Sequence, residues 1–314
     1  MTAVRPFARP RALHAGDRVA LLSLASPPRA EDVDAGADEL RALGFEPVIV
    51  AAPPGSSAPY VAGPAAARAA QLRGAITDPH IAAIMATRGG YGSAQLLPYL
   101  DLDEIRQARP LLIGYSDITA LLDLVTGRCG VTSIHGPMAE GRLARGPASY
   151  DRDTFLRTVC EPVAFGRVAT PTARVLQPGR ARGVLRGGTL TQIAALLGTP
   201  WAFTATEPTV LFLDEVNERP YRLDRLVWQL CAAGVLDRVT GVVVNQLPGC
   251  DEPGGSVTAL EAVRAALTAF AGPVVTGVPS GHTLDAMITL PLGVQVTLEA
   301  ATDVSLSIDE AAVA

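Results

Sequence analysis

The stretch PLLIGYSDITALLDLV (residues 110–125) joins a strand pattern to a helix pattern. Its first residues form a short apolar run that ends at Gly114-Tyr115, as in a buried strand of a parallel sheet. From Asp117 onward the apolar residues recur at helical spacing. Ser116 lies at the junction, where a serine either caps the helix or acts as a nucleophile on a sharp turn. Ile118 replaces the second glycine of the G-x-S-x-G pattern, so both possibilities stay open at this point.

Strand and helix patterns alternate on the N-terminal side of this junction. The expected strands lie at 18–25, 45–51 and 81–87, and the expected helices at 30–44 and 66–77. This alternation predicts an α/β fold with a doubly wound parallel sheet. Ligands of such sheets bind at the C-terminal ends of the strands, where TRGGYG (87–92) and GYSD (114–117) fall.

A second α/β domain is expected in the C-terminal part of the chain. Residues 161–182 are rich in Pro, Arg and Gly and have weak periodicity, which predicts a linker between an N-terminal domain over 1–160 and a C-terminal domain over 183–314. Beyond the linker, TVLFLDEV (209–216) predicts a buried strand and RPYRLDRLVWQLCAAGVL (219–236) a helix. Ser116 and His282 fall in different domains by this division, so an active site that uses both is expected in the cleft between the domains.

Composition excludes several classes of function. Charged residues make up 18% of the 314 and the net charge is −5, so no basic surface for nucleic acid is expected. No apolar run is long enough for a membrane span, and we expect a cytoplasmic protein without a membrane partner. The scattered cysteines (129, 160, 231 and 250) lack zinc spacing, and no dinucleotide fingerprint or phosphate loop occurs. We therefore expect no metal and no cofactor.

A serine nucleophile requires a base, and the chain has four histidines. His14 precedes the first strand and His80 follows a turn, so both are expected in solvent. His135, in SIHGPM, follows a short strand pattern and could line the same cleft, but it is expected to be a packed structural histidine. His282 lies in a loop of small residues, GVPSGHTLDAMITLPLG, which suits the presentation of an imidazole, although a binding or surface role remains open.

The base in turn requires an acid to orient it. Asp214, Glu215 and Glu218 follow the strand over 209–216 and are the candidates. A carboxylate at this position can equally cap the next helix, and Glu218 is expected to do so from its first turn.

The sequence as a whole resembles the LD-carboxypeptidase family, which includes the microcin C self-immunity peptidases. The resemblance runs in order from about residue 16 to 298 and rests on six segments: ATRGGYGSAQLLPYLD, LLIGYSDITALL, SIHGPM, RGGTLTQIAALLGTP, LFLDEVNERPYRLDRLVWQL and GVPSGHTLDAMITLPLG. The family's LED is LDE in this chain, and the asparagine of its GGNL motif is Thr189.

This resemblance implies a homodimeric serine peptidase with a Ser-acid-His triad and two α/β domains. It assigns Ser116 as the nucleophile and His282 as the base, and an ungapped reading of LDE favours Asp214 as the acid, with Glu215 the alternative. It places the oxyanion hole at the amides of Asp117 and Gly90. The residues expected at the substrate are Arg88, Gly89, Tyr91, Arg186 and Gly188, with Arg222 a further candidate for its carboxylate.

The resemblance implies a small peptide as substrate. The leading hypothesis is release of the terminal D-alanine from murein tetrapeptides during peptidoglycan recycling. The alternative within the family is a microcin-immunity peptidase that hydrolyses an aminoacyl-nucleotide amide. A third possibility, of another class, is a muropeptide-binding protein without catalysis.

Overall fold

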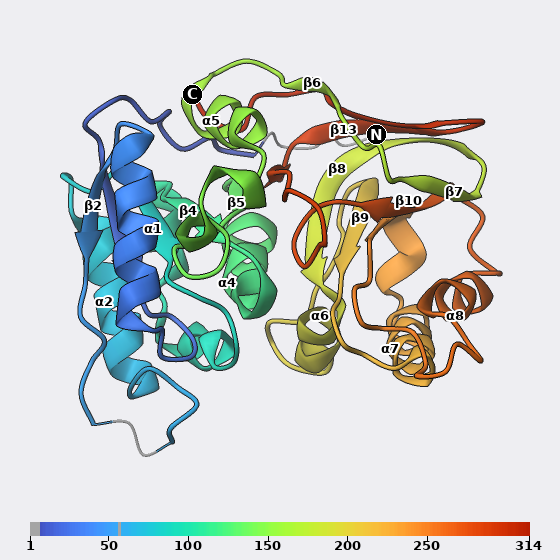
Figure 1. Cartoon of the computed structure of the whole chain (residues 1–314), viewed down its shortest axis with the longest axis horizontal. Coiled ribbons are helices and arrows are strands. Elements are labelled where there is room, and N and C mark those ends of the chain that lie inside the picture. The colour runs from blue at the N-terminus through green and yellow to red at the C-terminus, as the bar shows by residue number, and fades with distance from the viewer. Residues whose placement is uncertain (1–6, 56–57) are drawn as a thin grey trace.

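The computed structural model describes residues 7–55 and 58–314 and folds them into two α/β halves, each built on one sheet (Figure 1). The two-domain α/β fold predicted from the sequence is confirmed. Buried aliphatic side chains fill the space between each sheet and its helices, and one continuous apolar core extends from the first sheet into the second.

The first sheet has the strand order β12-β5-β4-β3-β1-β2. All neighbours in it are parallel except β12, which pairs antiparallel with β5 at the edge. The central strands β3 and β4 are buried along their whole length, which explains their continuous apolar sequence. Its strands are β1 (Arg18–Leu22), β2 (Glu46–Ile49), β3 (Ala83–Ala86), β4 (Leu111–Gly114), β5 (Ser133–His135) and β12 (Leu290–Leu292).

Helices cover both faces of this sheet (Figure 1). They are α1 (Ala30–Ala42), α2 (Ala65–Thr77), α3 (Leu102–Ala108), α4 (Thr119–Asp123) and α5 (Arg152–Cys160). The carboxylates of Asp101 and Asp151 accept hydrogen bonds from the first-turn amides of α3 and α5 and so begin these helices. Short helix α4 contacts β8 and α6 of the second half, so the helix that follows Ser116 lies at the junction of the two halves.

The second sheet has the order β6-β14-β13-β8-β9-β10-β11-β7. Strands β8 to β11 are parallel, and the outer strands pair antiparallel. The strands are β6 (Gly166–Val168), β7 (Arg174–Gln177), β8 (Gly179–Thr189), β9 (Thr209–Asp214), β10 (Val239–Asn245), β11 (Val274–Val278), β13 (Gln295–Ala300) and β14 (Val304–Ile308). Helices α6 (Leu190–Leu196), α7 (Pro220–Ala232) and α8 (Ala259–Ala266) lie together below this sheet in Figure 1.

The segment that the sequence predicts to be a linker forms strands in the structure. Residues 161–182 contain β6, β7 and the start of β8, all of them part of the second sheet. Strands β6 and β7 lie at the two edges of that sheet and are partly exposed, so they lack the apolar alternation that identifies a strand in sequence.

The end of the chain returns to the first half. Strand β12 joins the first sheet, and the backbone of Ala314 exchanges hydrogen bonds with Pro10 and Ala12. The halves are therefore tied together by pairing across the expected boundary. Among residues 7–55 and 58–314, no helix has both the length and the apolar character needed to cross a bilayer.

Candidate active site

Ser116 lies on a sharp turn between strand β4 and a short 3₁₀ helix over Ser116–Ile118. Its φ angle is +64°, a left-handed conformation that is strained for a serine. Among the described residues the Ser116 hydroxyl makes no hydrogen bond and therefore caps neither of the helical turns that follow. The backbone lifts this side chain out of the sheet as a nucleophile elbow does.

The glycine-rich turn after β3 packs directly against Ser116. A Cβ atom on Gly89 would lie 2.7 Å from Ser116 Cβ and 2.8 Å from its Oγ, so only glycine fits there. The next residue, Gly90, has φ +103° and is exposed. Within the described part of the chain, neither Gly90 N–H nor Asp117 N–H donates a hydrogen bond, so both amides beside the hydroxyl are available to a ligand.

A buried arginine that the sequence analysis missed holds this turn. Arg68 is fully buried, and its guanidinium donates to the carbonyls of Leu24 (2.6 Å), Gly92 (2.9 Å) and Gly63 (3.0 Å). From the other side, the buried Asp117 carboxylate accepts a hydrogen bond from the Ser93 amide at 2.7 Å. The glycine turn is therefore held from both sides.

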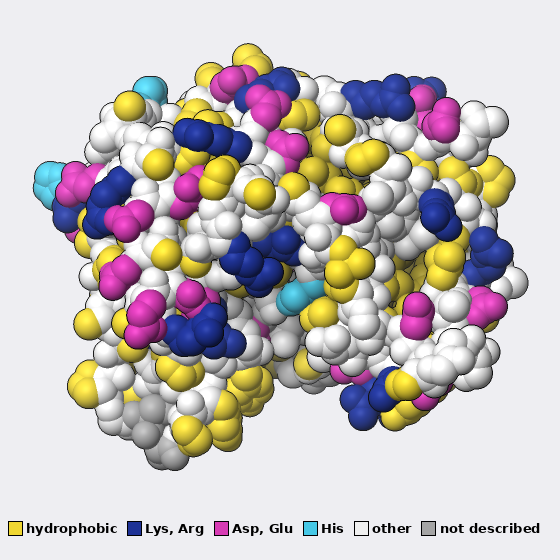
Figure 2. Space-filling model, in the orientation of Figure 1, with side chains coloured by type: hydrophobic (Ala, Val, Ile, Leu, Met, Phe, Trp, Pro, Cys, Tyr) yellow, Lys and Arg dark blue, Asp and Glu magenta, His cyan; other side chains and the backbone are white. Residues whose placement is uncertain are grey.

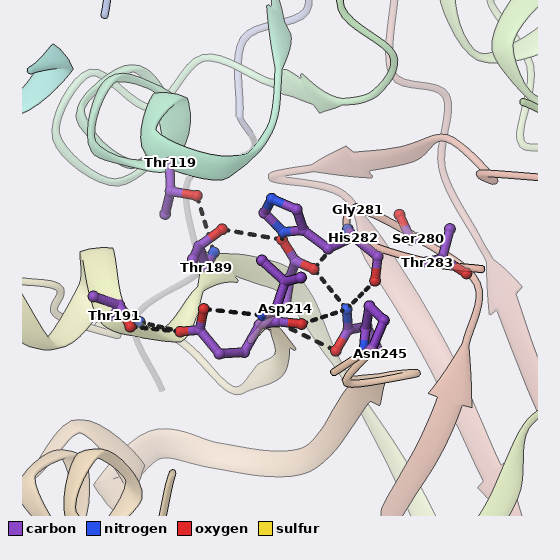
Figure 3. A network of polar contacts seen from close by, with 12 residues as sticks. Thr119, Thr189, Thr191, Asp214, Asn245, Ser280, Gly281, His282 and Thr283 are labelled. Carbon is purple, nitrogen blue, oxygen red and sulfur yellow. Dashed lines mark hydrogen bonds and ion pairs between the residues drawn. The ribbon is translucent and has the colours of Figure 1, made fainter. Parts of the chain in front are cut away.

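His282 and Asp214 form a hydrogen-bonded pair in the second half (Figure 3). His282 Nδ1 lies 2.8 Å from Asp214 Oδ2, and the His282 amide donates to Oδ1 at 2.8 Å. Asp214, at the end of β9, has no exposed surface. The contact with Oδ2 fixes the tautomer that carries hydrogen on Nδ1 and leaves Nε2 free to accept a proton.

The pKa values of the pair shift in opposite directions. Burial alone would lower the pKa of His282, but the charge of Asp214 and its hydrogen bond outweigh that effect and raise it. Burial alone would raise the pKa of Asp214, but His282 outweighs burial here as well and lowers it. Asp214 is therefore ionised and poised to stabilise an imidazolium.

Three further residues complete the surroundings of Asp214 and His282. Thr189 Oγ1 donates to Asp214 Oδ2 at 3.0 Å, and Asn245 Nδ2 donates to Oδ1 at 2.6 Å and to the His282 carbonyl (Figure 3). Arg142, from the first half, donates to the carbonyls of Gly281 (3.2 Å) and Thr283 (2.7 Å) on either side of His282. Of these three residues, Asn245 could have been found from the sequence, because it ends the apolar strand β10, which pairs with β9.

Tyr115 links Ser116 to His282, and among the described residues no hydrogen bond joins the two directly. The Tyr115 ring, adjacent to Ser116 in the chain, packs edge to face against the His282 ring with 5.2 Å between centroids. The expected hydrogen bond of roughly 3 Å between hydroxyl and imidazole is not formed in this structure. Catalytic hydrogen bonds are often long without substrate and tighten when it binds.

Glu215, the alternative acid, points away from His282. Its carboxylate accepts hydrogen bonds from the Thr191 amide (2.9 Å) and hydroxyl (2.6 Å), at the start of α6. Neighbouring residues at the end of a strand face opposite sides, which explains why only Asp214 contacts the histidine. Glu218 precedes the N-cap of α7 and therefore lies outside the first turn in which it was expected; it contacts Arg222 at 3.4 Å.

The other histidines occupy the places expected of them. His14 and His80 are exposed. His135 has no exposed surface, contacts Ser280 Oγ at 3.2 Å, and its pKa is lowered to about 4 by burial. It is a neutral packed residue behind the Asp214–His282 pair.

Two of the expected substrate contacts are wrong. Arg186, on β8, is buried against Asp123 of α4 (2.6 Å) and Glu207 (3.5 Å), so its charge is already neutralised at the junction of the halves. Gly188 contacts Thr119: a Cβ atom there would meet the threonine side chain, so this glycine permits close packing of β8 on α4. Both residues hold the halves together and do not face a ligand.

The remaining expected contacts are exposed to different degrees. Arg88 is half-exposed and forms an ion pair with Glu140 at 3.2 Å. Tyr91 is exposed and packs on the Tyr60 ring at 5.7 Å between centroids. Arg222 lies on α7 and is bonded to Glu218.

The loop that carries His282 lies so close to Asp214 that Gly281 has no room for a side chain. A Cβ atom there would lie 2.5 Å from Asp214 Cγ, and the φ angle of +70° already disfavours other residues. Gly281→Ala is expected to lower kcat/KM by about 100-fold, because displacement of the imidazole by about 1 Å has that effect.

The matched control is Gly255→Ala. Gly255 has a similar φ of +72°, but a Cβ atom there would meet nothing within 4 Å, so the variant carries the same backbone strain without the clash. Steady-state kinetics and thermal unfolding should be measured for both. Equal kinetic loss in the two variants would contradict the role of the close approach.

Known proteins share this architecture and sequence. Residues 19–136 match the model of the LD-carboxypeptidase N-terminal domain, and residues 182–298 match that of the C-terminal domain. A Streptomyces coelicolor protein with a provisional carboxypeptidase name is 37% identical to this chain over 316 residues. The match covers 98% of each chain. The murein tetrapeptide carboxypeptidase of Pseudomonas aeruginosa is 34% identical over 232 residues, which cover 71% of this chain and 74% of that protein.

The fold also matches a solved structure along its whole length. The microcin C7 self-immunity protein MccF, in complex with aspartyl sulfamoyl adenosine, superposes with a TM-score of 0.89. The match covers 98% of this chain and 99% of that one at 23% sequence identity. This second likeness concerns the fold alone.

Proposed function

Because the chain belongs to the LD-carboxypeptidase family, we propose that it is a serine carboxypeptidase that releases the terminal D-alanine from murein tetrapeptides. The observation that carries this proposal is the buried Asp214–His282 pair beside Ser116. Strain at Ser116, two free amides beside it and an ionised partner for the histidine all support nucleophilic catalysis.

The geometry supports a two-step acyl transfer. Ser116 Oγ attacks the carbonyl carbon of the residue before D-alanine, and His282 Nε2 takes the hydroxyl proton. The oxyanion forms between the amides of Gly90 and Asp117, each typically worth about 3 kcal/mol to the transition state. His282 then protonates the departing amine, and D-alanine leaves. In the second step water attacks the carbonyl of the acyl-serine while His282 takes its proton, and His282 returns a proton to Ser116 Oγ as the shortened peptide leaves.

Mass spectrometry of a murein tetrapeptide incubated with the protein tests this proposal directly. The expected result is loss of one alanine and appearance of the tripeptide. An aminoacyl-nucleotide amide should be incubated in parallel, because the alternative activity of the family predicts cleavage of that compound alone. A fluorophosphonate probe addresses the non-catalytic alternative: an enzyme is labelled at Ser116, whereas a binding protein without an activated serine is not.

The resemblance also supports assembly and location as expectations. We propose a homodimer, which light scattering after size exclusion would detect as twice the mass of the chain. We further propose that the enzyme acts in the cytoplasm on recycled muropeptides, which fractionation of producing cells would check.

The shifted pKa of His282 predicts the pH dependence of catalysis. A general base must be neutral, so kcat/KM is expected to fall as pH drops through the His282 pKa, which lies above the ordinary value of about 6.5. In Asp214→Asn the negative charge that raises the pKa of His282 is absent, while burial still lowers that pKa. The acid limb in the pH profile of the residual activity is therefore expected to move to lower pH. An unchanged acid limb in that variant would contradict the assignment of this limb to the pair.

A further inference from the structure

We propose that Arg145 binds the free α-carboxylate of the leaving D-amino acid and so makes this enzyme a carboxypeptidase. This proposal rests on the proposed function, because it assigns the feature of the substrate that separates a terminal residue from an internal one. A carboxypeptidase requires a cation that binds the α-carboxylate of its substrate. The arginines expected from the sequence, Arg88, Arg186 and Arg222, are each already paired with an acidic side chain.

The side of the site on which the leaving group lies follows from the chemistry. The oxyanion is held at Gly90 and Asp117, and His282 must reach the departing amine to protonate it. The α-carboxylate is attached to the carbon next to that amine. It must therefore lie on the histidine side of Ser116, away from the glycine turn and from Arg88, which adjoins Gly90.

Arg145 lies on the histidine side. A Cβ atom on Gly141 would be 3.9 Å from both Arg145 Nη2 and the Tyr115 hydroxyl, so no more than about 8 Å separates the two atoms. The Tyr115 ring in turn packs on His282. Burial raises the pKa of the Tyr115 phenol, and the charges of Arg142 and Arg145 act against that rise, which is further evidence that both arginines are near.

Arg145 is also the arginine of this region whose charge is unused. It is exposed and, among the described residues, forms no hydrogen bond or ion pair. Arg142, three residues earlier, is buried, and its guanidinium donates hydrogen bonds to carbonyls, including those of Gly281 and Thr283. Arg88 is paired with Glu140. Figure 2 shows dark blue side chains beside a cyan histidine in the hollow where the two halves meet.

The backbone that carries Arg145 is fixed even though its side chain is free. It ends a 3₁₀ turn over Leu143–Arg145, in which Leu143 is buried and donates its amide to Met138. The Ala144 amide donates to Ala139 at 3.0 Å. A planar guanidinium on such a base can bind both oxygens of a carboxylate, whereas a point charge cannot do so with the same geometry.

The kinetic test compares two substrates, a murein tetrapeptide with a free C-terminal carboxylate and the same peptide with a C-terminal amide. The native enzyme is expected to favour the acid form. Arg145→Met is expected to lower kcat/KM for the acid form by about 10- to 100-fold, the usual effect of losing a charged hydrogen bond, and to leave the amide form almost unchanged. Arg145→Lys should recover part of the preference. The matched control, Arg167→Met, removes an exposed arginine on β6 and should change neither rate.

A binding test separates this proposal from the proposed function. The Ser116→Ala protein is expected to bind the acid form more tightly than the amide by calorimetry, and Ser116→Ala/Arg145→Met to bind both equally. An acid preference that survives in Arg145→Met, by rate or by binding, overturns the role of Arg145. Failure of the native enzyme to release D-alanine overturns the proposed function, and the calorimetry then decides separately whether Arg145 recognises the carboxylate.

Discussion

Ser116→Ala is expected to abolish release of D-alanine, with kcat falling by about 10⁴- to 10⁶-fold. The hydroxyl is the proposed nucleophile, and alanine has no atom that could form the covalent bond in its place. The substitution should leave stability unchanged or slightly raised, because the side chain makes no hydrogen bond to any described residue. Single-turnover kinetics with a murein tetrapeptide and thermal unfolding measure the two effects.

Ser256→Ala is the matched control for that experiment. Ser256 lies in an exposed loop of the second half, so its removal should change neither turnover nor labelling by a fluorophosphonate. Near-normal turnover by a well-folded Ser116→Ala protein would end the interpretation as a serine peptidase. Retained turnover together with retained labelling would indicate that a different nucleophile had been overlooked.

The elements that sequence predicted well are those whose burial follows a simple period. Strands β3 and β4 are buried on both faces, so their apolar runs predicted them to within a few residues. The helical pattern over 30–44 appears as α1, which ends before Gly44 at φ +94°. Where the pattern was weak, as in β6 and β7, partial exposure at a sheet edge removed the signal and the segment was interpreted as a linker.

The residues that we propose for catalysis are those that a local motif marks in the sequence. Ser116, Asp214 and His282 each occupy a recognisable junction of strand and loop. Arg68 and Arg142 could not be found this way, because all but one of their partners are backbone carbonyls, which every residue has. Arg186 was placed at the substrate because it precedes a glycine motif, but proximity in sequence does not reveal that its side chain points into the protein toward Asp123.

Asp214 and Glu215 provide the sharpest choice that the structure offers. Asp214→Asn is expected to lower kcat by about 10⁴-fold, the loss that follows when an orienting aspartate becomes an amide and the wrong histidine tautomer is favoured. Glu215→Gln keeps an acceptor for Thr191 and is expected to have a small effect, mainly on stability. The two variants remove the same charge from adjacent residues, so each is the control for the other.

The proposed role of Asp214 requires an aspartate at a position where the resemblance implies a longer glutamate. Aspartate is shorter by one methylene, so the histidine loop must come closer to the end of β9. Gly281 permits this approach, since any side chain there would collide with the Asp214 carboxyl group. The His282 amide and ring then bond the two carboxylate oxygens separately, each at 2.8 Å.

The same geometry predicts what a longer acid would do. Asp214→Glu is expected to push the loop away and to lower kcat by about 100-fold, despite keeping the charge, because misplacement by about 1 Å has that effect. Kinetics of Asp214→Asn, Asp214→Glu and Glu215→Gln should be compared with their thermal unfolding. A severe loss confined to Glu215→Gln would show that Glu215 orients the histidine during turnover, and the Asp214 assignment would be wrong.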